Sequence, residues 1–340
     1  MSEREIDIYK NKKDQLPQIP FSCSLMMGSY SVNLYTHLSG FREELARPNN
    51  AYSMSIPGWS VQEKPGIGPH SIRVIESETP DLRYDKENQI LYVLGNPDVF
   101  KDGQSIAWLS YWLMEAQRQA ESSFTMHSSA LSLDNKGVLL LGHSGSGKTS
   151  IMLDLCRRFN GEVISNDLTV VSHDKPSNRM ALVDGTKEIR LRLTSVSRNF
   201  PDLAHLFPDE QISPWENKIV TTPEEIGISS ATGQRDLRAI FEVHLDNDYD
   251  SSLIVQKVND IGIKYRLYED TSRIVRASAI SVFSDTKDFL GYIPPLDTEE
   301  LHNNRVGCID CMTNEIGVVS LSGGNLRQVS DSMNDIVRNI

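Results

Sequence analysis

Short apolar runs, separated by glycine, proline and polar residues, dominate the first 100 residues of the chain. Runs of this length and composition are typical of β-strands, and they occur at Ser24–Tyr35, His70–Glu76 and Leu82–Leu94. Within the last run, polar residues 85–88 separate two apolar segments, as the turn of a hairpin does. The pattern predicts a mostly antiparallel α+β region at the N-terminus.

A helical pattern follows at residues 102–120. Its apolar residues recur at spacings of three and four along the chain: Ile106, Leu109, Leu113, Ala116 and Ala120. We expect this helix to join an N-terminal region, residues 1–120, to a second region, residues 121–340.

The second region alternates between strand and helix. Residues Gly137–Leu141 form an uninterrupted apolar run, which is typical of a strand buried on both faces. A helix is predicted next, because four apolar residues share one helical face: Ile151, Met152, Leu155 and Phe159. Residues 163–167 are then predicted to form another strand. This order of elements predicts an α/β fold.

Composition and charge exclude several classes of protein. The chain has 34 Lys and Arg against 46 Asp and Glu, a formal net charge of −12, and only small basic groups. Nucleic acid is therefore not expected as a partner, because phosphate neutralisation needs a clustered basic face. The first 25 residues lack the pattern of a secretory signal, and no apolar run reaches the roughly 18 residues of a membrane span. We expect a cytoplasmic protein without a membrane partner.

A glycine-rich segment lies between the buried strand and the helix. It fits the pattern G-x-x-x-x-G-K-[ST], and Ser150 follows it: Gly142, His143, Ser144, Gly145, Ser146, Gly147, Lys148 and Thr149. Such glycines let backbone N–H groups turn towards phosphate oxygens. Lys148 is expected to bind the β- and γ-phosphates of ATP, and the Thr149 hydroxyl to coordinate Mg²⁺. The sequence therefore predicts a nucleotide site at residues 142–150, with ATP and Mg²⁺ as cofactors.

Asp167 and His127 are candidates for the chemistry. If the strand before Asp167 runs parallel to residues 137–141, its carboxyl end comes out beside the glycine loop. A carboxylate there can hold Mg²⁺ or accept a proton from an attacking hydroxyl, and the alternative is a solvated aspartate that caps a turn. His127 lies just before the buried strand, and its spacing alone favours a structural role over a catalytic one.

Three segments together resemble the HPr kinase/phosphorylase family: Met126-His127-Ser128, Gly142–Thr149 and Ile164-Ser165-Asn166-Asp167. That family has a Met-His before the strand of its phosphate loop and an Ala-Asp-Asp at the end of the next strand. The arrangement is also similar to that of phosphoenolpyruvate carboxykinases. The resemblance covers roughly residues 124–172. It implies a P-loop kinase domain that transfers the γ-phosphoryl group of ATP to a hydroxyl, with His127 and Asp167 in the active site, and it implies a homo-oligomer.

The sequence departs from the family pattern at two places in these motifs. Asn166 replaces the first aspartate of the pair, and Ser150 stands where the family has glutamate. The later Gly-Arg-Asn stretch associated with phosphorylase activity is also missing. These departures favour a divergent kinase that acts on a free amino acid, another metabolite, or a serine of a biosynthetic peptide or protein.

Basic residues are needed to hold an anionic substrate and to neutralise charge on the transferred group. Arg190 and Arg192 share one face of a predicted strand and are candidates for substrate binding, although a solvent-exposed charged face explains them equally well. Arg273 and Arg276 are weaker candidates on a predicted helical face.

Two other classes of protein stay open. The loss of one aspartate favours a nucleotide-gated binding or regulatory protein that transfers no phosphate to a partner molecule. Residues Ser320–Gln328 are similar to the signature loop of ABC-type ATPases, but the strand that should follow it is absent from the remaining residues. We therefore interpret Ser322-Gly323-Gly324 as a turn.

Overall fold

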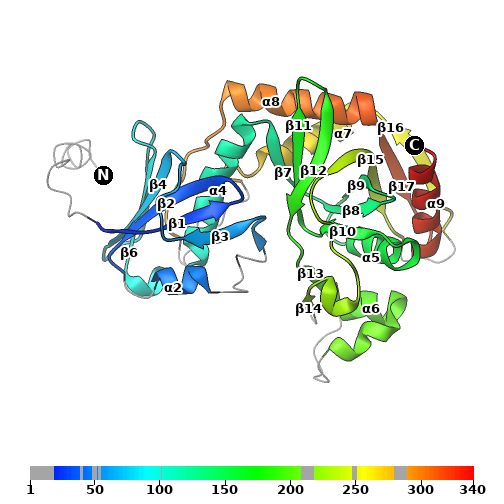
Figure 1. Ribbon diagram of the computed structural model, residues 1–340, viewed down its shortest axis with the longest axis horizontal. Helices are drawn as coiled ribbons and strands as arrows, with labels where there is room; N and C mark the ends of the chain where they lie inside the picture. The colour runs from blue at the N-terminus through cyan, green and yellow to red at the C-terminus, as the bar shows by residue number, and fades with distance from the viewer. Residues whose placement is uncertain are drawn as a thin grey trace. The chain divides into compact units, whose positions relative to one another are not determined.

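A computed structural model describes residues 19–38, 41–47, 52, 55–100, 102–207, 218–246, 251–278 and 289–340 (Figure 1). The chain forms two compact units. The N-terminal unit comprises Met1–Asn50, Ser60–Met114 and Ile280–Pro294. The C-terminal unit comprises Ala51–Trp59, Glu115–Ala279 and Pro295–Ile340. The protein is therefore of the mixed α/β class, with more than one sheet.

A six-stranded sheet forms the N-terminal unit. Its strand order is β3-β1-β2-β4-β6-β5. The strands are β1 (Phe21–Met27), β2 (Tyr30–Thr36), β3 (Trp59–Gln62), β4 (His70–Glu76), β5 (Asp81–Asp85) and β6 (Ile90–Gly95). Two short helices, α2 (Phe41–Ala46) and η1 (Pro97–Phe100), accompany the sheet.

The prediction of a mostly antiparallel N-terminal sheet is met only in part. β1–β2 and β5–β6 are antiparallel hairpins, but β2–β4 and β4–β6 are parallel pairs. The β5–β6 hairpin with its turn after Asp85 was predicted correctly, because the polar turn residues lie directly between the two strands in the sequence. Strand direction across the sheet depends on long connections, and the alternation of apolar and polar residues carries no information about it.

Helix α4 (Gln104–Ala120) confirms the predicted helical pattern. Its residues up to Met114 belong to the N-terminal unit, and those from Glu115 belong to the C-terminal unit. Ile106, Leu109 and Leu113 are fully buried.

A nine-stranded sheet organises the C-terminal unit. Its main strand order is β10-β8-β9-β15-β12-β11-β7, and β17 pairs with both β15 and β16. The strands are β7 (Ser123–His127), β8 (Ser129–Leu133), β9 (Lys136–Leu141), β10 (Glu162–Ser165), β11 (Leu168–Asp174), β12 (Arg179–Gly185), β15 (Arg235–His244), β16 (Ile254–Val258) and β17 (Val318–Ser322). β9, β15 and β17 are parallel, and β10 runs in the same direction because both it and β9 are antiparallel to β8.

Helices cover both faces of this sheet (Figure 1). α5 (Lys148–Phe159) and α9 (Leu326–Arg338) pack on one face. α7 (Ile261–Ser272), α8 (Glu299–Asp310) and the π-helical turn η4 (Cys311–Ile316) pack on the other. A smaller pair, β13 (Ile189–Arg192) and β14 (Lys218–Thr221), lies next to α6 (Leu193–Asn199), η2 (Pro201–Leu206) and η3 (Glu224–Ile226).

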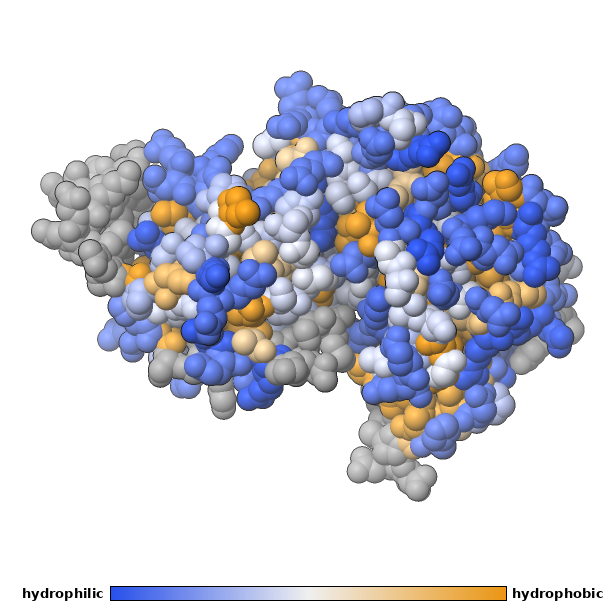
Figure 2. Space-filling model, in the orientation of Figure 1, coloured by the Kyte–Doolittle hydropathy of each residue, from blue (hydrophilic) through white to orange (hydrophobic). Residues whose placement is uncertain are grey.

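Strand β9 contributes to the apolar cores on both faces. Val138 and Leu140 belong to the cluster under α5 and α9, whereas Leu139 and Leu141 belong to the cluster under α7 and α8. The predicted double-sided burial of residues 137–141 is therefore confirmed. On the visible surface, hydrophobic residues occur as small scattered groups among hydrophilic ones (Figure 2). Among the described residues, no helix is both long enough and apolar enough to cross a membrane.

Candidate active site

The glycine loop connects β9 to α5, as the sequence predicts. Gly142, Gly145 and Gly147 have φ angles of +150°, +84° and +99°, which side chains rarely tolerate. A Cβ atom on Gly142 would lie 2.4 Å from the Ser146 hydroxyl oxygen, and one on Gly147 would lie 2.4 Å from the Leu245 side chain. Glycine is therefore required at both positions by conformation and by space.

The start of α5 presents unpaired hydrogen-bond donors. Its N-cap is Gly147, which provides no side-chain cap for the N–H groups of the first turn. The Ser146 hydroxyl is buried and makes no hydrogen bond with any residue that the structure describes. Backbone donors at a helix N-terminus, together with an orphaned hydroxyl, fit the oxygens of a polyphosphate.

Lys148 lies folded over the loop. Its ammonium donates to the carbonyl oxygens of Gly142 and His143, at 2.7 Å and 3.2 Å, and its side chain is buried. Burial lowers the pKa of Lys148, while the nearby carboxylates of Asp167 and Asp270 act in the opposite direction. A buried cation beside the start of a helix is suited to bind an anion.

His127 and Asp167 meet at the same edge of the sheet. The His127 Nε2 atom lies 3.2 Å from the Asp167 Oδ1 atom, and the Ser128 N–H donates to the Asp167 carbonyl at 3.0 Å. The hydrogen bond from His127 holds the pKa of Asp167 below its ordinary value, assisted by the charges of Arg190 and Lys148. Both side chains remain accessible, with exposed fractions of 28% for His127 and 51% for Asp167.

Asn166 links the glycine loop to the rest of the site. Its side-chain oxygen accepts a hydrogen bond from the Thr149 hydroxyl at 2.9 Å, and its side-chain nitrogen donates to the Glu188 carbonyl at 3.0 Å. The residue is buried. Asn166 therefore acts as a neutral hydrogen-bonding bridge between α5 and the start of β13.

The other predicted residues divide into two groups. Arg190 pairs with Glu188 at 2.5 Å, and its charge reaches Asp167. Arg192 ends β13 and is the N-cap of α6. The Ser150 hydroxyl lies 2.9 Å from that of Ser195 in α6. The structure thus brings Lys148, His127, Asp167 and Arg190 together, and it directs Ser150 towards α6.

Asp270, on α7, is a carboxylate of the site that sequence analysis missed. Burial raises the pKa of Asp270, and the charges of His127, Arg273, Lys148 and Arg266 oppose that effect. Its only sequence signal is an acidic residue in the last turn of a helix, where the helix dipole disfavours negative charge. It can be recognised only after the bounds of α7 have been established.

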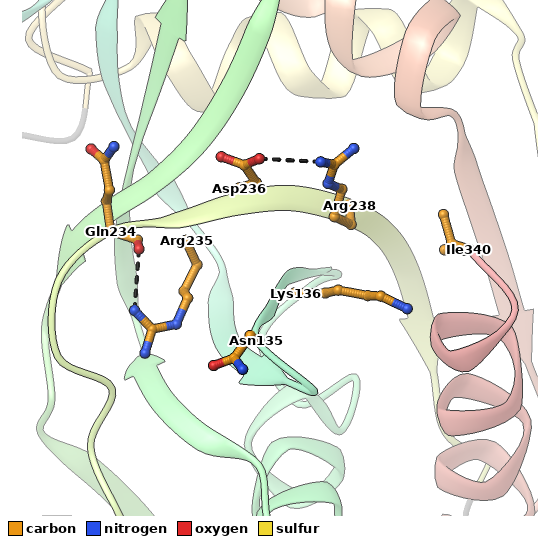
Figure 3. Close-up of a pocket in the computed structure, with 7 residues that line it drawn as sticks. All are labelled: Asn135, Lys136, Gln234, Arg235, Asp236, Arg238 and Ile340. Atoms are coloured by element: carbon orange, nitrogen blue, oxygen red, sulfur yellow. Dashed lines mark hydrogen bonds and ion pairs between the residues drawn. The ribbon is translucent and has the colours of Figure 1, made fainter.

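A separate cavity of about 400 Å³ lies where β9 and β15 begin, at the strand ends opposite to the glycine loop (Figure 3). Its three cations already bind protein acceptors. Lys136 donates to the Val337 carbonyl, Arg235 donates to the Thr232 carbonyl, and Arg238 pairs with Asp236. The cavity therefore contributes nothing to the site at the loop.

The side chains of the site also determine how it could hold Mg²⁺. Within the described ranges, no group of three or more His, Cys, Asp or Glu side chains is arranged to hold a metal ion. A magnesium ion bound together with nucleotide needs no such group, because phosphates and water supply most of its ligands. The Thr149 hydroxyl and the Asp167 carboxylate fit this smaller requirement.

The site is thus built from a strand, a glycine loop, a helix and a His–Asp pair in an α/β unit. No protein-family model matches the sequence, and no curated protein matches it. Among solved structures, the HPr(Ser) kinase/phosphatase from Coxiella burnetii is similar, with 13% sequence identity and a TM-score of 0.31. The match covers 63% of this chain and 88% of that chain. The two backbones agree only in part.

Proposed function

We propose that the protein is an ATP-dependent kinase that transfers the γ-phosphoryl group to a hydroxyl. One observation supports this proposal above the others: the buried Lys148 ammonium lies on a glycine loop, and its charge interacts with Asp167, which is paired with His127. An anion-binding loop beside a carboxylate and an imidazole provides what phosphoryl transfer requires, which is positioning and electrostatic stabilisation.

Each residue has a separate task in this proposal. The N–H groups of residues 142–149 and Lys148 bind the phosphates, and His127 positions the γ-phosphoryl group. Asp167 orients the acceptor hydroxyl. When bound, Mg²⁺ would neutralise phosphate charge, with Thr149 and Asp167 as its protein ligands.

The acceptor is proposed to be a small metabolite, such as an amino acid, or a serine of a biosynthetic peptide or protein. Arg190 supports an acceptor that carries negative charge, since its guanidinium is more than half exposed and its charge reaches Asp167. It is therefore available to bind a carboxylate in addition to Glu188.

A second candidate is a nucleotide-gated binding protein that transfers no phosphate. The neutral Asn166 favours it, because the amide that accepts from the Thr149 hydroxyl adds no negative charge to hold Mg²⁺. Tight ATP binding without turnover would distinguish this protein from a kinase, and hydrolysis that needs no acceptor would indicate an ABC-type ATPase.

The experiment that tests the kinase is a mass-spectrometric search for phosphorylated products. The protein is incubated with ATP, Mg²⁺ and an extract of metabolites and peptides, with Lys148→Ala as the matched control. We expect a product about 80 Da heavier that forms with the wild type alone, since a phosphoryl group replaces one proton. Confirmed ATP binding without such a product would favour the nucleotide-gated protein.

A further inference from the structure

Helix α7 carries Asp270 to the strand ends where the glycine loop begins. The helix follows β16, whose last residue, Val258, pairs with Val318 at the start of β17. It therefore begins near the amino ends of the parallel strands and runs over the sheet face. Arg266 forms an ion pair with Glu242, and Glu242 is the register partner of Leu141, the last residue before the loop.

Asp270 lies one turn beyond Arg266 on the same face of α7, because residues four apart share a helical face. This register places its carboxylate past the end of β9, on the side of the loop. The electrostatic interactions of Asp270 with Lys148 and His127 agree with that placement.

The carboxylate of Asp270 differs from those around it in having no partner. It makes no hydrogen bond or ion pair with any described residue. By contrast, Asp167 pairs with His127, Glu188 with Arg190, and Glu242 with Arg266. Asp270 is only partly buried, so its carboxylate is not held in a structural ion pair and is available to meet a substrate.

The backbone next to Asp270 is nevertheless held firmly. Gln119 donates from its side chain to the Thr271 carbonyl at 2.7 Å, and Arg305 donates to the Gln119 side chain at 2.8 Å. Gln119, Thr271 and Arg305 are all fully buried. An unpaired group on a fixed backbone is the arrangement expected of a residue that acts on a substrate.

We infer that Asp270 accepts the proton of the acceptor hydroxyl and supplies the second carboxylate that Asn166 does not provide. This inference rests on the proposed kinase function. The hydroxyl oxygen forms a bond to the γ-phosphorus, and the bond from that phosphorus to the β,γ-bridging oxygen breaks. The electron pair of the broken bond leaves with ADP. The hydroxyl proton moves to the Asp270 carboxylate and later to water.

The different environments of the two carboxylates support this division of roles. Burial raises the pKa of Asp270, whereas the hydrogen bond from His127 lowers the pKa of Asp167. The group with the higher pKa is the better proton acceptor, and the other remains a stable anion. The groups that face Asp270 are His127 from β7, Lys148 from α5, Arg266 from α7 and Arg273, the C-cap of α7.

The test compares Asp270→Asn with the matched control Glu269→Gln, which neutralises the neighbouring exposed carboxylate. Calorimetry measures the affinities for ATP and for ADP in the presence of Mg²⁺. Asp270→Asn is expected to tighten ATP several-fold relative to ADP, since it removes a negative charge that faces the γ-phosphate. Glu269→Gln should leave the ratio of the two affinities unchanged. A purely structural role for Asp270 would not alter this ratio.

The second readout is ATP hydrolysis, in which water replaces the acceptor as the probe. Asp270→Asn should lower its rate by roughly 10²- to 10⁴-fold and remove the acid limb of its pH profile. An ATP-to-ADP affinity ratio equal to that of the wild type would overturn the inference, whether or not hydrolysis is measurable. A wild type that binds no ATP would overturn the kinase proposal itself, so the two failures are distinguishable.

Discussion

Two groups of charged and polar side chains in the C-terminal unit differ in how completely they are paired. The first, which we call the buried network, joins α4, β7, α8 and the segment before α8, and consists of Glu115, Arg118, Gln119, Thr125, Asp297 and Arg305. The second is the site at the glycine loop, with His127, Lys148, Asp167 and Asp270. In the buried network Glu115 accepts hydrogen bonds from Gln119 and Thr125, and Arg305 pairs with Asp297 at 2.5 Å.

This difference in pairing separates a group that stabilises the fold from a group that is available to a ligand. Charges in a low-dielectric interior stabilise a fold only when their hydrogen bonds are satisfied, and the buried network meets that condition almost throughout. One exception is the Arg305 Nε atom, which has no hydrogen-bond partner among the described residues. The site instead keeps an unpaired carboxylate, an orphaned hydroxyl and an uncapped helix N-terminus. These unpaired groups lower the stability of the fold, but they leave donors and acceptors available to bind a ligand.

The largest expected effect is that of Asp167→Asn on phosphoryl transfer. Removing the charge that orients the acceptor should lower the transfer rate by roughly 10²- to 10⁴-fold. The side chain is half exposed, so the melting temperature should hardly change. Single-turnover measurements of ADP formation check the rate, and calorimetry checks that ATP still binds. Full activity in this variant would remove Asp167 from the mechanism.

Arg305→Met should produce the opposite pattern to Asp167→Asn, because its main effect should be on stability. The guanidinium is fully buried, and its loss leaves the Gln119 side-chain oxygen without its donor and leaves Asp297 with Arg276 alone. Leaving a buried acceptor without its donor lowers the free energy of unfolding by about 1–3 kcal/mol. Urea unfolding measures the loss, and Arg273→Met, at an exposed position after α7, is the control. Equal stability of the two variants would show that the buried network contributes little.

Lys148→Ala should weaken ATP binding by roughly 10- to 100-fold, the value of a charge-assisted hydrogen bond to phosphate. Because the burial of the ammonium disfavours its charged form, we expect the stability to stay constant or to rise. Calorimetric titration with ATP, together with thermal unfolding, separates the two effects. A large loss of stability with unchanged affinity would place Lys148 among the structural residues.

The smallest expected effect is on the loss of stability at low pH. Burial alone would raise the pKa of Asp297, but hydrogen bonds from Arg305 and Arg276 hold it below its ordinary value of 3.8. A lowered pKa contributes stability that is present above pH 3.8 and is lost as the pH falls through the folded-state pKa. Urea unfolding between about pH 5 and pH 2 should therefore show a shallower decline for Asp297→Asn than for the wild type. Identical slopes would contradict the pairing.

The sequence predicted those parts of the site that depend on neighbouring residues. β9, the glycine loop and α5 follow from one apolar run, one motif and one helical face within residues 137–159. The carboxyl end of β10 emerges on the loop side because β10 runs in the same direction as β9, as the prediction for Asp167 required.

What the sequence did not predict depends on tertiary packing. The pattern of α7 gives no indication of which strands it crosses, so Asp270 was not identified as a neighbour of Lys148. Arg305 looks like an exposed helical arginine until Asp297, Gln119 and Tyr268 are brought around it. The parallel pairs of the N-terminal sheet were missed for the same reason, since they join segments that are distant in the chain.

Asn166 has a consequence for the routes by which this sequence can change. Its side-chain nitrogen donates to the Glu188 carbonyl, so an aspartate there would face that oxygen with another acceptor. Such an exchange would leave a buried acceptor unsatisfied, at a cost of about 1–3 kcal/mol. A second aspartate therefore cannot be introduced here by one substitution without loss of stability, unless the surroundings of the Glu188 carbonyl change as well. The neutral amide is thus matched to the backbone acceptor beside it.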